Sequence, residues 1–218
     1  MTDKTIEQRL DRLESLDAIR QLPAKYALTL DMRDMNAMVN LFCADVSVGK
    51  AGTGRAALRP YMDRTLRSPF TGTSHHIGGH IIEFDDPDHA RGIVYSKNEH
   101  ETPAQGSDDP QAGEWVVMQM MYADDYERQD GQWFFRRRLP LYWYATDLNK
   151  PPMGENKMRW PDTEWAEGNF HKLFPSFAEF WAREGDDGSP VPEPAPLEQF
   201  IAAMRRGQDA PRVKVRAD

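Results

Sequence analysis

The spacing of apolar residues changes partway along the chain, and this change constrains the fold more than any other feature of the sequence. Over residues 4–31 apolar side chains recur mostly every three or four positions, which predicts helix. Pro23 interrupts this pattern and is expected to end one helix or begin the next. Asp34 is the predicted N-cap of a short second helix, a strand is expected over 45–48, and a third helix is expected over 55–67.

From residue 75 onward the period is two, which is typical of strands with one buried face. Four strands are expected, over 75–84, 90–100, 115–128 and 132–144. Asp130-Gly131 is a strong hairpin signal between the last two strands, and the polar segment 102–113 is a longer hairpin loop. Three helices followed by an antiparallel meander predict an α+β fold with its helices on one face of a sheet.

Composition and charge limit the partners of the chain. The 218 residues carry a net charge of −8, which argues against nucleic acid or an anionic membrane as a partner. No apolar run reaches the roughly 18 residues of a membrane span, and the N-terminus lacks the apolar stretch of a secretory signal. Cys43 is the only cysteine, so no internal disulfide can form. We therefore expect a cytoplasmic protein.

The composition shifts after residue 147. Residues 1–147 contain the predicted helices and sheet, whereas 148–218 hold nine of the sixteen prolines. The aromatic stretch 163–183 is too apolar to remain unpacked, and a further helix is expected over 197–206. We expect 148–218 to form an extension that packs on the domain or on a neighbouring subunit.

Asp31 ends the apolar face of the first predicted helix, and Tyr26 lies on the same face. A carboxylate directed into the apolar interior would be partly desolvated, which raises its pKa and makes it a useful base. An aspartate that only caps the turn at the helix end is the alternative, and spacing alone leaves both open.

Three histidines lie on the first predicted strand. Strict alternation puts His76 and His80 on one face and His75 on the other. Four positions along a strand separate His76 and His80 by about 13 Å, which is too far for one metal ion without another element between them. We expect no metal site, and histidines with a purely structural role are an alternative.

Further polar groups lie on the apolar strands, where they could bind a substrate or stabilise negative charge. Together with His76 and His80, these candidates are Asn98, His100, Arg136, Tyr142 and Tyr144. The arginine run 136–138 must put at least one guanidinium on the buried face, where it requires a carboxylate or a ligand anion. A cross-strand pair with Asp124 or Asp125 is the structural alternative.

The chain resembles the SnoaL-like branch of the nuclear transport factor 2-like superfamily in three segments that occur in the same order. They are IRQLPAKYALTLDMRDMNAMVNLFCADVSV, TSHHIGGHIIEFDDPDHARG and DDYERQDGQWFFRRR, and they cover roughly residues 6–145. The resemblance implies a cone-shaped α+β barrel in which an Asp–His pair removes a proton, usually without a cofactor. The superfamily includes dehydratases, a dehydrochlorinase, ketosteroid isomerase and polyketide cyclases.

Carried onto this sequence, the resemblance implies that Asp31 is the carboxylate and His75 the base, with His76 as the register alternative. Tyr26, with Arg136 or a neighbour, would stabilise negative charge on the substrate. Gly79 departs from the Asn that is common at this position, and His80 and His100 are additional histidines.

The expected function is that of a cofactor-independent lyase with a small hydrophobic substrate, aromatic or polycyclic. Dehydration is one expected reaction, and retro-aldol loss of formaldehyde from a lignin-derived diaryl compound is another. The alternatives are an isomerase or cyclase on the same scaffold and a non-catalytic binding module. A homo-oligomer is expected, with a trimer favoured over a dimer.

Overall fold

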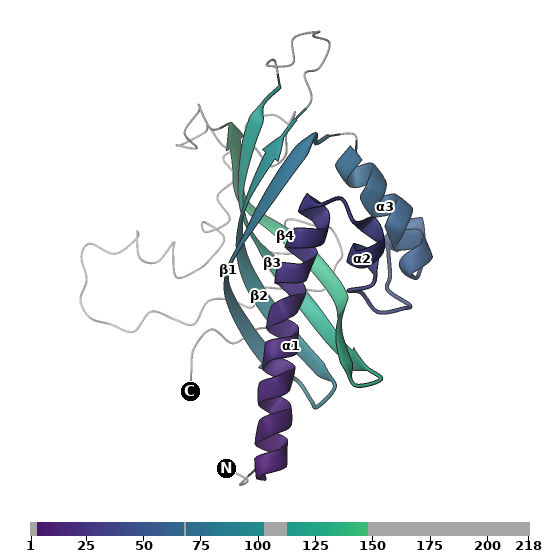
Figure 1. Ribbon diagram of the computed structural model, residues 1–218, viewed down its shortest axis with the longest axis vertical. Helices are drawn as coiled ribbons and strands as arrows, with labels where there is room; N and C mark the ends of the chain where they lie inside the picture. Colours follow the sequence, from purple (N-terminus) through teal and green to yellow (C-terminus); the bar gives the residue numbers. More distant parts are fainter. Residues whose placement is uncertain (1–3, 68, 103–112, 148–218) are drawn as a thin grey trace, which may run out of the picture.

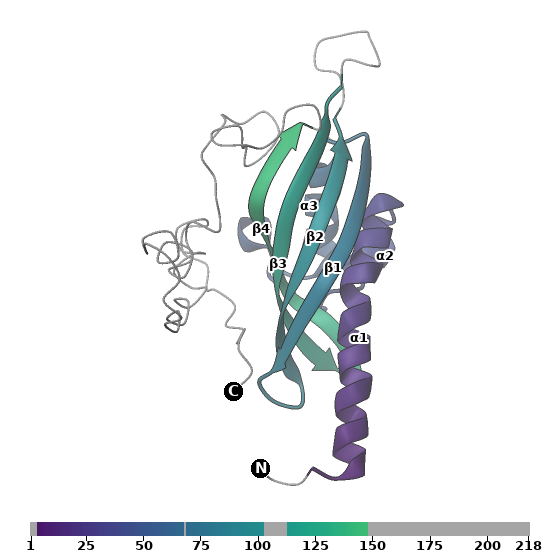
Figure 2. The same cartoon turned by 90° about the vertical axis from the view of Figure 1, so that its left-hand side faces the viewer.

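The computed structural model describes residues 4–67, 69–102 and 113–147. Its helices are α1 (Ile6–Asp31), α2 (Met35–Val39) and α3 (Arg55–Arg67), with a 3₁₀ turn, η1 (Gly49–Ala51). Its strands are β1 (Gly72–Phe84), β2 (His89–Glu101), β3 (Trp115–Gln129) and β4 (Gln132–Asp147). The strands pair antiparallel in the order β1-β2-β3-β4, and the helices lie on one side of the curved sheet (Figures 1 and 2).

This arrangement confirms the predicted α+β cone fold, with three helices preceding an antiparallel meander. Each of the four strands predicted from residue 75 onward is present, with ends within three residues of the expected ones. None of the helices in the described ranges is long and apolar enough to cross a membrane. The extension predicted over 148–218, including its helix at 197–206, lies outside the described residues.

Helix α1 runs unbroken from Ile6 to Asp31, so the expectation that Pro23 ends a helix is wrong. A proline inside a helix costs about 3 kcal/mol because it removes a hydrogen bond and crowds the preceding turn. Burial of the apolar face offsets this cost, at about 1.5–3 kcal/mol for each large side chain. The large buried side chains of that face are Ile19, Leu22, Tyr26 and Leu30.

The segment between α1 and α3 follows the prediction in part. Asp34 caps α2, because its side chain accepts a hydrogen bond from the backbone N–H of Ala37. No strand forms over 45–48, where only an isolated bridge joins Ser47 to Thr53. The turn η1 and the glycines around it reverse the chain directly after residue 48. Residues 45–48 therefore do not extend into a strand.

A bulge in β1 corrects the predicted alternation of its histidines. His75 pairs with Asn98 and His80 pairs with Val94. Five steps along β1 therefore correspond to four steps along β2. The extra residue falls at Gly78-Gly79, where the register shifts. Both His75 and His80 therefore lie on the inner face of the sheet.

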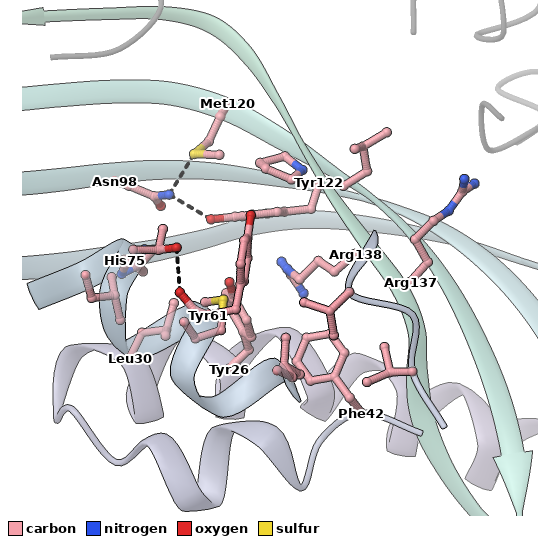
Figure 3. Close-up of a pocket in the computed structure, with 18 of the residues that line it drawn as sticks. Tyr26, Leu30, Phe42, Tyr61, His75, Asn98, Met120, Tyr122, Arg137 and Arg138 are labelled. Carbon is pink, nitrogen blue, oxygen red and sulfur yellow. Dashed lines mark hydrogen bonds between the residues drawn. The ribbon is translucent and has the colours of Figure 1, made fainter. Parts of the chain in front are cut away.

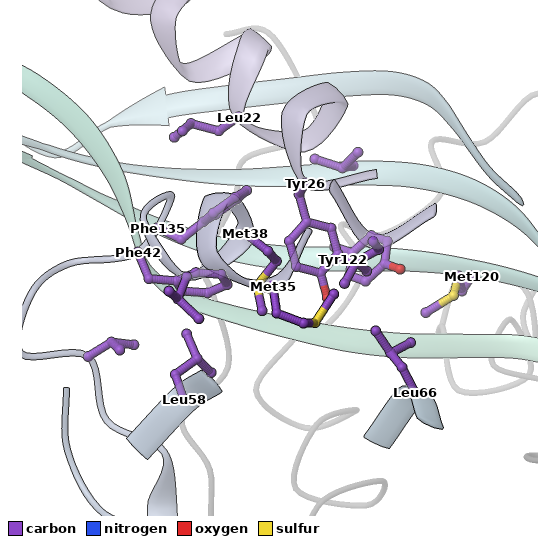
Figure 4. Close-up of a cluster of buried hydrophobic side chains, with 14 of the residues drawn as sticks. Leu22, Tyr26, Met35, Met38, Phe42, Leu58, Leu66, Met120, Tyr122 and Phe135 are labelled. Carbon is purple, nitrogen blue, oxygen red and sulfur yellow. The ribbon is translucent and has the colours of Figure 1, made fainter. Parts of the chain in front are cut away.

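The core fills the space between the inner face of the sheet and the helices (Figure 4). Tyr26 of α1 lies at its centre, with its ring edge-on to those of Phe42, Tyr122 and Phe135 at centroid distances of 6.0–6.2 Å. These aromatic contacts fix the end of α1, which positions the residues that follow Tyr26 against β1.

Candidate active site

Asp31 and His75 form a hydrogen-bonded pair where the helical layer meets the sheet. Asp31 is the last residue of α1, and His75 lies on the inner face of β1, 44 positions later in the chain. Oδ1 of Asp31 lies 2.6 Å from Nδ1 of the His75 ring, and Oδ2 accepts a 2.9 Å hydrogen bond from the His75 backbone N–H. We call this pair the dyad.

Two further groups fix the carboxylate of the dyad. The hydroxyl of Thr73 donates to Oδ1 of Asp31 at 2.9 Å, and Arg33 donates to that same hydroxyl at 2.7 Å. Burial by itself would raise the pKa of Asp31, but the hydrogen bonds from His75 and Thr73 outweigh it and hold the pKa below its ordinary value. The expectation that desolvation raises this pKa is therefore wrong, and the carboxylate is ionised at neutral pH.

The imidazole of His75 lines an internal cavity, and its side chain is only 4% exposed. Because the ionised carboxylate of Asp31 accepts from Nδ1, that nitrogen carries the proton of the neutral ring. Nε2 is then the unprotonated nitrogen and can accept a proton. His76, the register alternative, pairs with Lys97 and is exposed on the outer face.

His100 lies beside the dyad as a second, neutral imidazole. Its ring centroid is 5.4 Å from that of His75 and 4.4 Å from that of Phe70. Burial, reinforced by repulsion from His75 and Arg33, lowers the pKa of His100 to about 3. Its Nδ1 has no hydrogen-bond partner among the described residues, although the ring is buried.

Asn98 and Tyr122 supply polar atoms to the cavity wall (Figure 3). Nδ2 of Asn98 donates a 2.9 Å hydrogen bond to the hydroxyl oxygen of Tyr122 and lies 2.7 Å from the sulfur of Met120. Oδ1 of Asn98 accepts from the hydroxyl of Ser96, so both ends of the amide are fixed. Burial raises the pKa of Tyr122, so its phenol stays protonated and can donate to a bound molecule.

Tyr26 and Arg138 lie together in the same wall, as expected for Tyr26. The guanidinium of Arg138 lies over the ring of Tyr26 at 4.4 Å and over that of Tyr122 at 3.8 Å. The pKa of Tyr26 is raised well above its ordinary value, mainly by burial. Nε and Nη2 of Arg138 make no hydrogen bond to any described residue, although the side chain is only 3% exposed.

Arg136, the arginine singled out from the sequence, borders the cavity but is bound elsewhere. Its guanidinium is 40% exposed and pairs with Asp45 and Glu127. A bulge between Asp125 and Tyr126 removes Arg136 from the inner face. Arg138 takes the inward place instead.

A second set of polar groups lies deeper in the core. His80 Nε2 is 3.0 Å from the hydroxyl of Tyr126, which donates to Oδ2 of Asp124 at 2.9 Å. Oδ2 of Asp124 lies 3.2 Å from Nη1 of Arg138, without the alignment of a hydrogen bond. A Cβ atom on Gly92 would lie 2.8 Å from Nε2 of His80. Only glycine at this position therefore leaves room for the contact between His80 and Tyr126. We call His80, Tyr126, Asp124 and Arg138 the buried cluster.

Burial controls the charges of the buried cluster. It raises the pKa of Asp124 to about 6, against the opposing effects of Arg138 and Tyr126. Burial, with repulsion from Arg138 and Arg20, lowers the pKa of His80 to about 4. Arg138 has the cross-strand acid expected for the arginine run, Asp124, although its Nε and Nη2 make no hydrogen bond to a described residue.

The cavity has a volume of about 1020 Å³ and is lined mainly by apolar side chains of α1, α3 and the inner face of the sheet. Tyr142 lines it as predicted, whereas Tyr144 pairs with Gln119 and is not part of the lining. Among the described residues, no three His, Cys, Asp or Glu side chains come together as metal ligands.

Comparison with known proteins defines the class to which this fold and site belong. The family model of the SnoaL-like domain matches residues 11–139, which is more than half of the chain. The protein therefore belongs to the SnoaL-like domain family, within the nuclear transport factor 2-like superfamily that the sequence resembled. A search of curated proteins gave no match.

Several solved structures are similar to this one. A protein from Novosphingobium aromaticivorans, solved under the name "Putative Scytalone Dehydratase", is 26% identical with a TM-score of 0.52, and the match covers 63% of this chain and 89% of that chain. A type 2 hexachlorocyclohexane dehydrochlorinase is 21% identical with a TM-score of 0.56, covering 71% of this chain and 99% of that chain. The type 3 enzyme of Novosphingobium barchaimii is 22% identical with a TM-score of 0.55, covering 64% and 94%. The likeness to the two dehydrochlorinases shows the shared fold alone.

Sequence reasoning missed two groups that the structure brings to the site. Arg138 belongs to the arginine run 136–138, but it was not singled out. Counting back from Tyr142 by twos puts both Arg138 and Arg136 on one face, and only the bulge, which leaves no clear sequence signal, separates them. Tyr122 was expected either in the core or in the lining of an apolar pocket, with no role in the site, and it lines the cavity. Its place on the same strand face as Met118 and Met120, near the predicted Asn98, was the available signal.

Proposed function

We propose that the protein is a lyase in which the dyad removes a proton from an aromatic or polycyclic substrate bound in the cavity, without a cofactor. The proposal is carried by the 2.6 Å contact between Asp31 and His75 at the wall of an apolar cavity of about 1020 Å³. A carboxylate that orients an imidazole also stabilises the imidazolium that forms when the ring accepts a proton.

Three groups near the dyad can stabilise negative charge on the substrate. Tyr26 and Tyr122 are protonated phenols because burial raises the pKa of each. Arg138 has a guanidinium with unused donors beside both rings. Donors fixed in an apolar enclosure favour a transition state with negative charge on oxygen, because they need no reorganisation when that charge develops.

Two lyase reactions suit this arrangement. In a dehydration, Nε2 of His75 takes a proton from carbon, a C=C bond forms as the neighbouring C–O bond breaks, and the departing hydroxide is protonated to water. In a retro-aldol cleavage, Nε2 takes the hydroxyl proton, the C–C bond breaks to release an aldehyde such as formaldehyde, and its electron pair passes to the adjoining carbon, which is then protonated.

The relatives support an elimination over other chemistry. The Novosphingobium aromaticivorans protein carries the name of a dehydratase at 26% identity, and the matched region includes most of that chain. A lignin-derived diaryl compound that loses formaldehyde is the finer proposal for the substrate, because the cavity is large, apolar and partly walled by aromatic rings.

Mass spectrometry of product mixtures tests the reaction class. The purified protein is incubated with a panel of aromatic alcohols and diols, including diaryl propanediols, and each product is weighed. We expect a product lighter than its substrate by the mass of water or formaldehyde. A product of equal mass would indicate an isomerase or cyclase, and tight binding without turnover would indicate a binding module. Either result would contradict the proposal.

Neighbouring histidines on β1 provide a matched pair of variants for the same assay. His75→Ala removes the proposed base and is expected to lower kcat by about 10²-fold to 10⁴-fold. His76→Ala removes an exposed imidazole one position away and should leave kcat close to the wild-type value. Equal activity of the two variants would contradict the role of His75.

A further inference from the structure

The face of the sheet that points away from the helices carries an apolar band. Met121 of β3 lies between Tyr95 and Leu141 of the neighbouring strands, and Ala123 lies between Ile93 and Leu139. The band comprises Ile93, Val117, Met121, Ala123, Leu139 and Leu141, and we call it the outer band. An antiparallel sheet with one free face normally carries polar residues there, so an apolar face calls for a covering partner.

The apolar residues of the outer face are concentrated on one half of the sheet. Five of the six residues of the outer band lie on β3 and β4, and only Ile93 lies on β2. Tyr95 on β2 and Ile81 on β1 point to the same face and are each 43% exposed. All described helices lie on the opposite face (Figure 2). The apolar requirement for a cover is therefore strongest on the half of the sheet that ends the described domain.

The chain supplies a suitable segment at that place. Strand β4 is an edge strand and ends at Asp147, after which 71 residues follow. The stretch 163–183 contains Trp165, Phe170, Leu173, Phe174, Phe177, Phe180 and Trp181. Fifteen residues separate this stretch from Asp147, and they span about 50 Å when extended. Leu139 lies eight positions from Asp147 along β4, which is about 26 Å, so this reach is enough to bring the aromatic stretch to the outer band.

We propose that the aromatic stretch 163–183 binds the outer band of its own chain. A tethered segment acts at an effective concentration on the order of millimolar, so it outcompetes a second copy of the chain at ordinary working concentrations. The occupant is thus intramolecular, and it covers the face opposite the catalytic cavity. This inference is independent of the reaction that the dyad performs.

Two exposed tyrosines provide a matched cross-linking test in the full-length chain. Tyr95 borders the outer band and is 43% exposed, whereas Tyr61 on α3 is 42% exposed on the helical side. Photoreactive benzoyl-phenylalanine is placed at position 95 or at position 61, which keeps an aromatic side chain and leaves the core intact. Each protein is irradiated at low concentration as an equal mixture of ¹⁵N-labelled and unlabelled chains, and the linked peptides are identified by mass spectrometry.

We expect cross-links from position 95 to peptides within 163–183, each with both peptides from the same isotopic chain. We expect at least a tenfold lower yield of such links from position 61. Mixed-isotope links from position 95 would show that a second copy provides the cover, and links from position 61 alone would place the segment on the helical side. The absence of links from position 95 to 163–183 would also overturn the proposal.

Discussion

Two sets of histidine and aspartate lie within the same cone, and only one of them borders the cavity. In the dyad, Asp31 contacts the imidazole of His75 directly. In the buried cluster, Asp124 reaches His80 only through the hydroxyl of Tyr126. The pKa of Asp31 is lowered, whereas the pKa of Asp124 is raised to about 6.

The difference indicates that nearness of an acid to an imidazole does not by itself give the geometry that we propose for a catalytic base. The dyad carboxylate receives three hydrogen bonds, and its imidazole meets the cavity where a substrate can bind. In the buried cluster, Oδ1 of Asp124 and Nδ1 of His80 have no hydrogen-bond partner among the described residues, and neither side chain lines the cavity. Within this cluster, the carboxylate of Asp124 holds the guanidinium of Arg138 in place.

Loss of the dyad carboxylate should have the largest effect. Asp31→Asn keeps the size of the side chain but removes the negative charge that stabilises the imidazolium of His75, so kcat should fall by about 10²-fold or more. Steady-state kinetics measure the loss, and circular dichroism checks that the fold persists. A variant that keeps the wild-type rate would show that Asp31 does not assist catalysis.

Loss of the buried carboxylate should mainly affect stability. Asp124→Asn leaves the guanidinium of Arg138 buried without a counter-charge, which should cost about 3–5 kcal/mol in the free energy of unfolding. Asp125→Asn is the matched control, because its pair with Arg137 is partly exposed and should contribute about 1 kcal/mol or less. Urea denaturation measures both, and equal losses would contradict the distinction.

The buried histidines predict how stability depends on pH. The pKa of His80 is lowered to about 4 and that of His100 to about 3, so the unfolded chain binds more protons than the folded one below pH 6.5. Stability contributed by these rings should therefore be lost as the pH falls from about 6.5 to 4. Asp124 has the opposite effect on stability over pH 4–6. Because its pKa is raised, its contribution to the stability of the folded state increases as the pH falls through this range.

Denaturation curves between pH 4 and 7 measure this dependence. His80→Gln should make the decline towards acid shallower than in the wild-type protein, since one of the two rings no longer titrates. The stabilisation that comes from the lowered pKa of Asp31 is present throughout this range and is lost only as the pH falls below about 3.8, so Asp31 does not affect the slope. An unchanged slope in His80→Gln would mean that His80 is protonated in the folded state.

The smallest effect is expected at Arg136. Its guanidinium is partly exposed and pairs with the exposed Asp45, so Arg136→Gln should leave both the unfolding midpoint and kcat close to the wild-type values. The same assays used for the other variants measure both. A large loss of kcat would return Arg136 to the role that the sequence analysis gave it.

The fold was largely predictable because apolar periodicity reports directly on helices and strands. The change of period located three helices and four strands, and Asp34 and Asp130-Gly131 marked a cap and a hairpin. Pro23 was misinterpreted because local rules do not include the packing energy of α1 against the sheet. The bulge at Gly78-Gly79 was missed because a register shift depends on pairing with another strand.

The site was predictable to a smaller extent. Spacing alone did not decide whether Asp31 caps the helix end or acts as a base. It also put His75 and His80 on different faces of the strand. The order of three motifs shared with a family supplied the pairing of Asp31 with His75, which the structure brings within hydrogen-bonding distance. Arg138 and Tyr122 were not found, because their role depends on which side chains share a cavity and not on their neighbours in sequence.

The dyad joins two layers of the molecule, since its acid ends a helix and its imidazole belongs to the sheet. Each layer alone would hold only half of the site. The rate of the proposed reaction therefore reports whether the end of α1 is packed against β1. Partial heating or mild denaturant that displaces the end of α1 would abolish the proposed activity while most of the sheet is still intact, and inactivation would then precede the main unfolding transition.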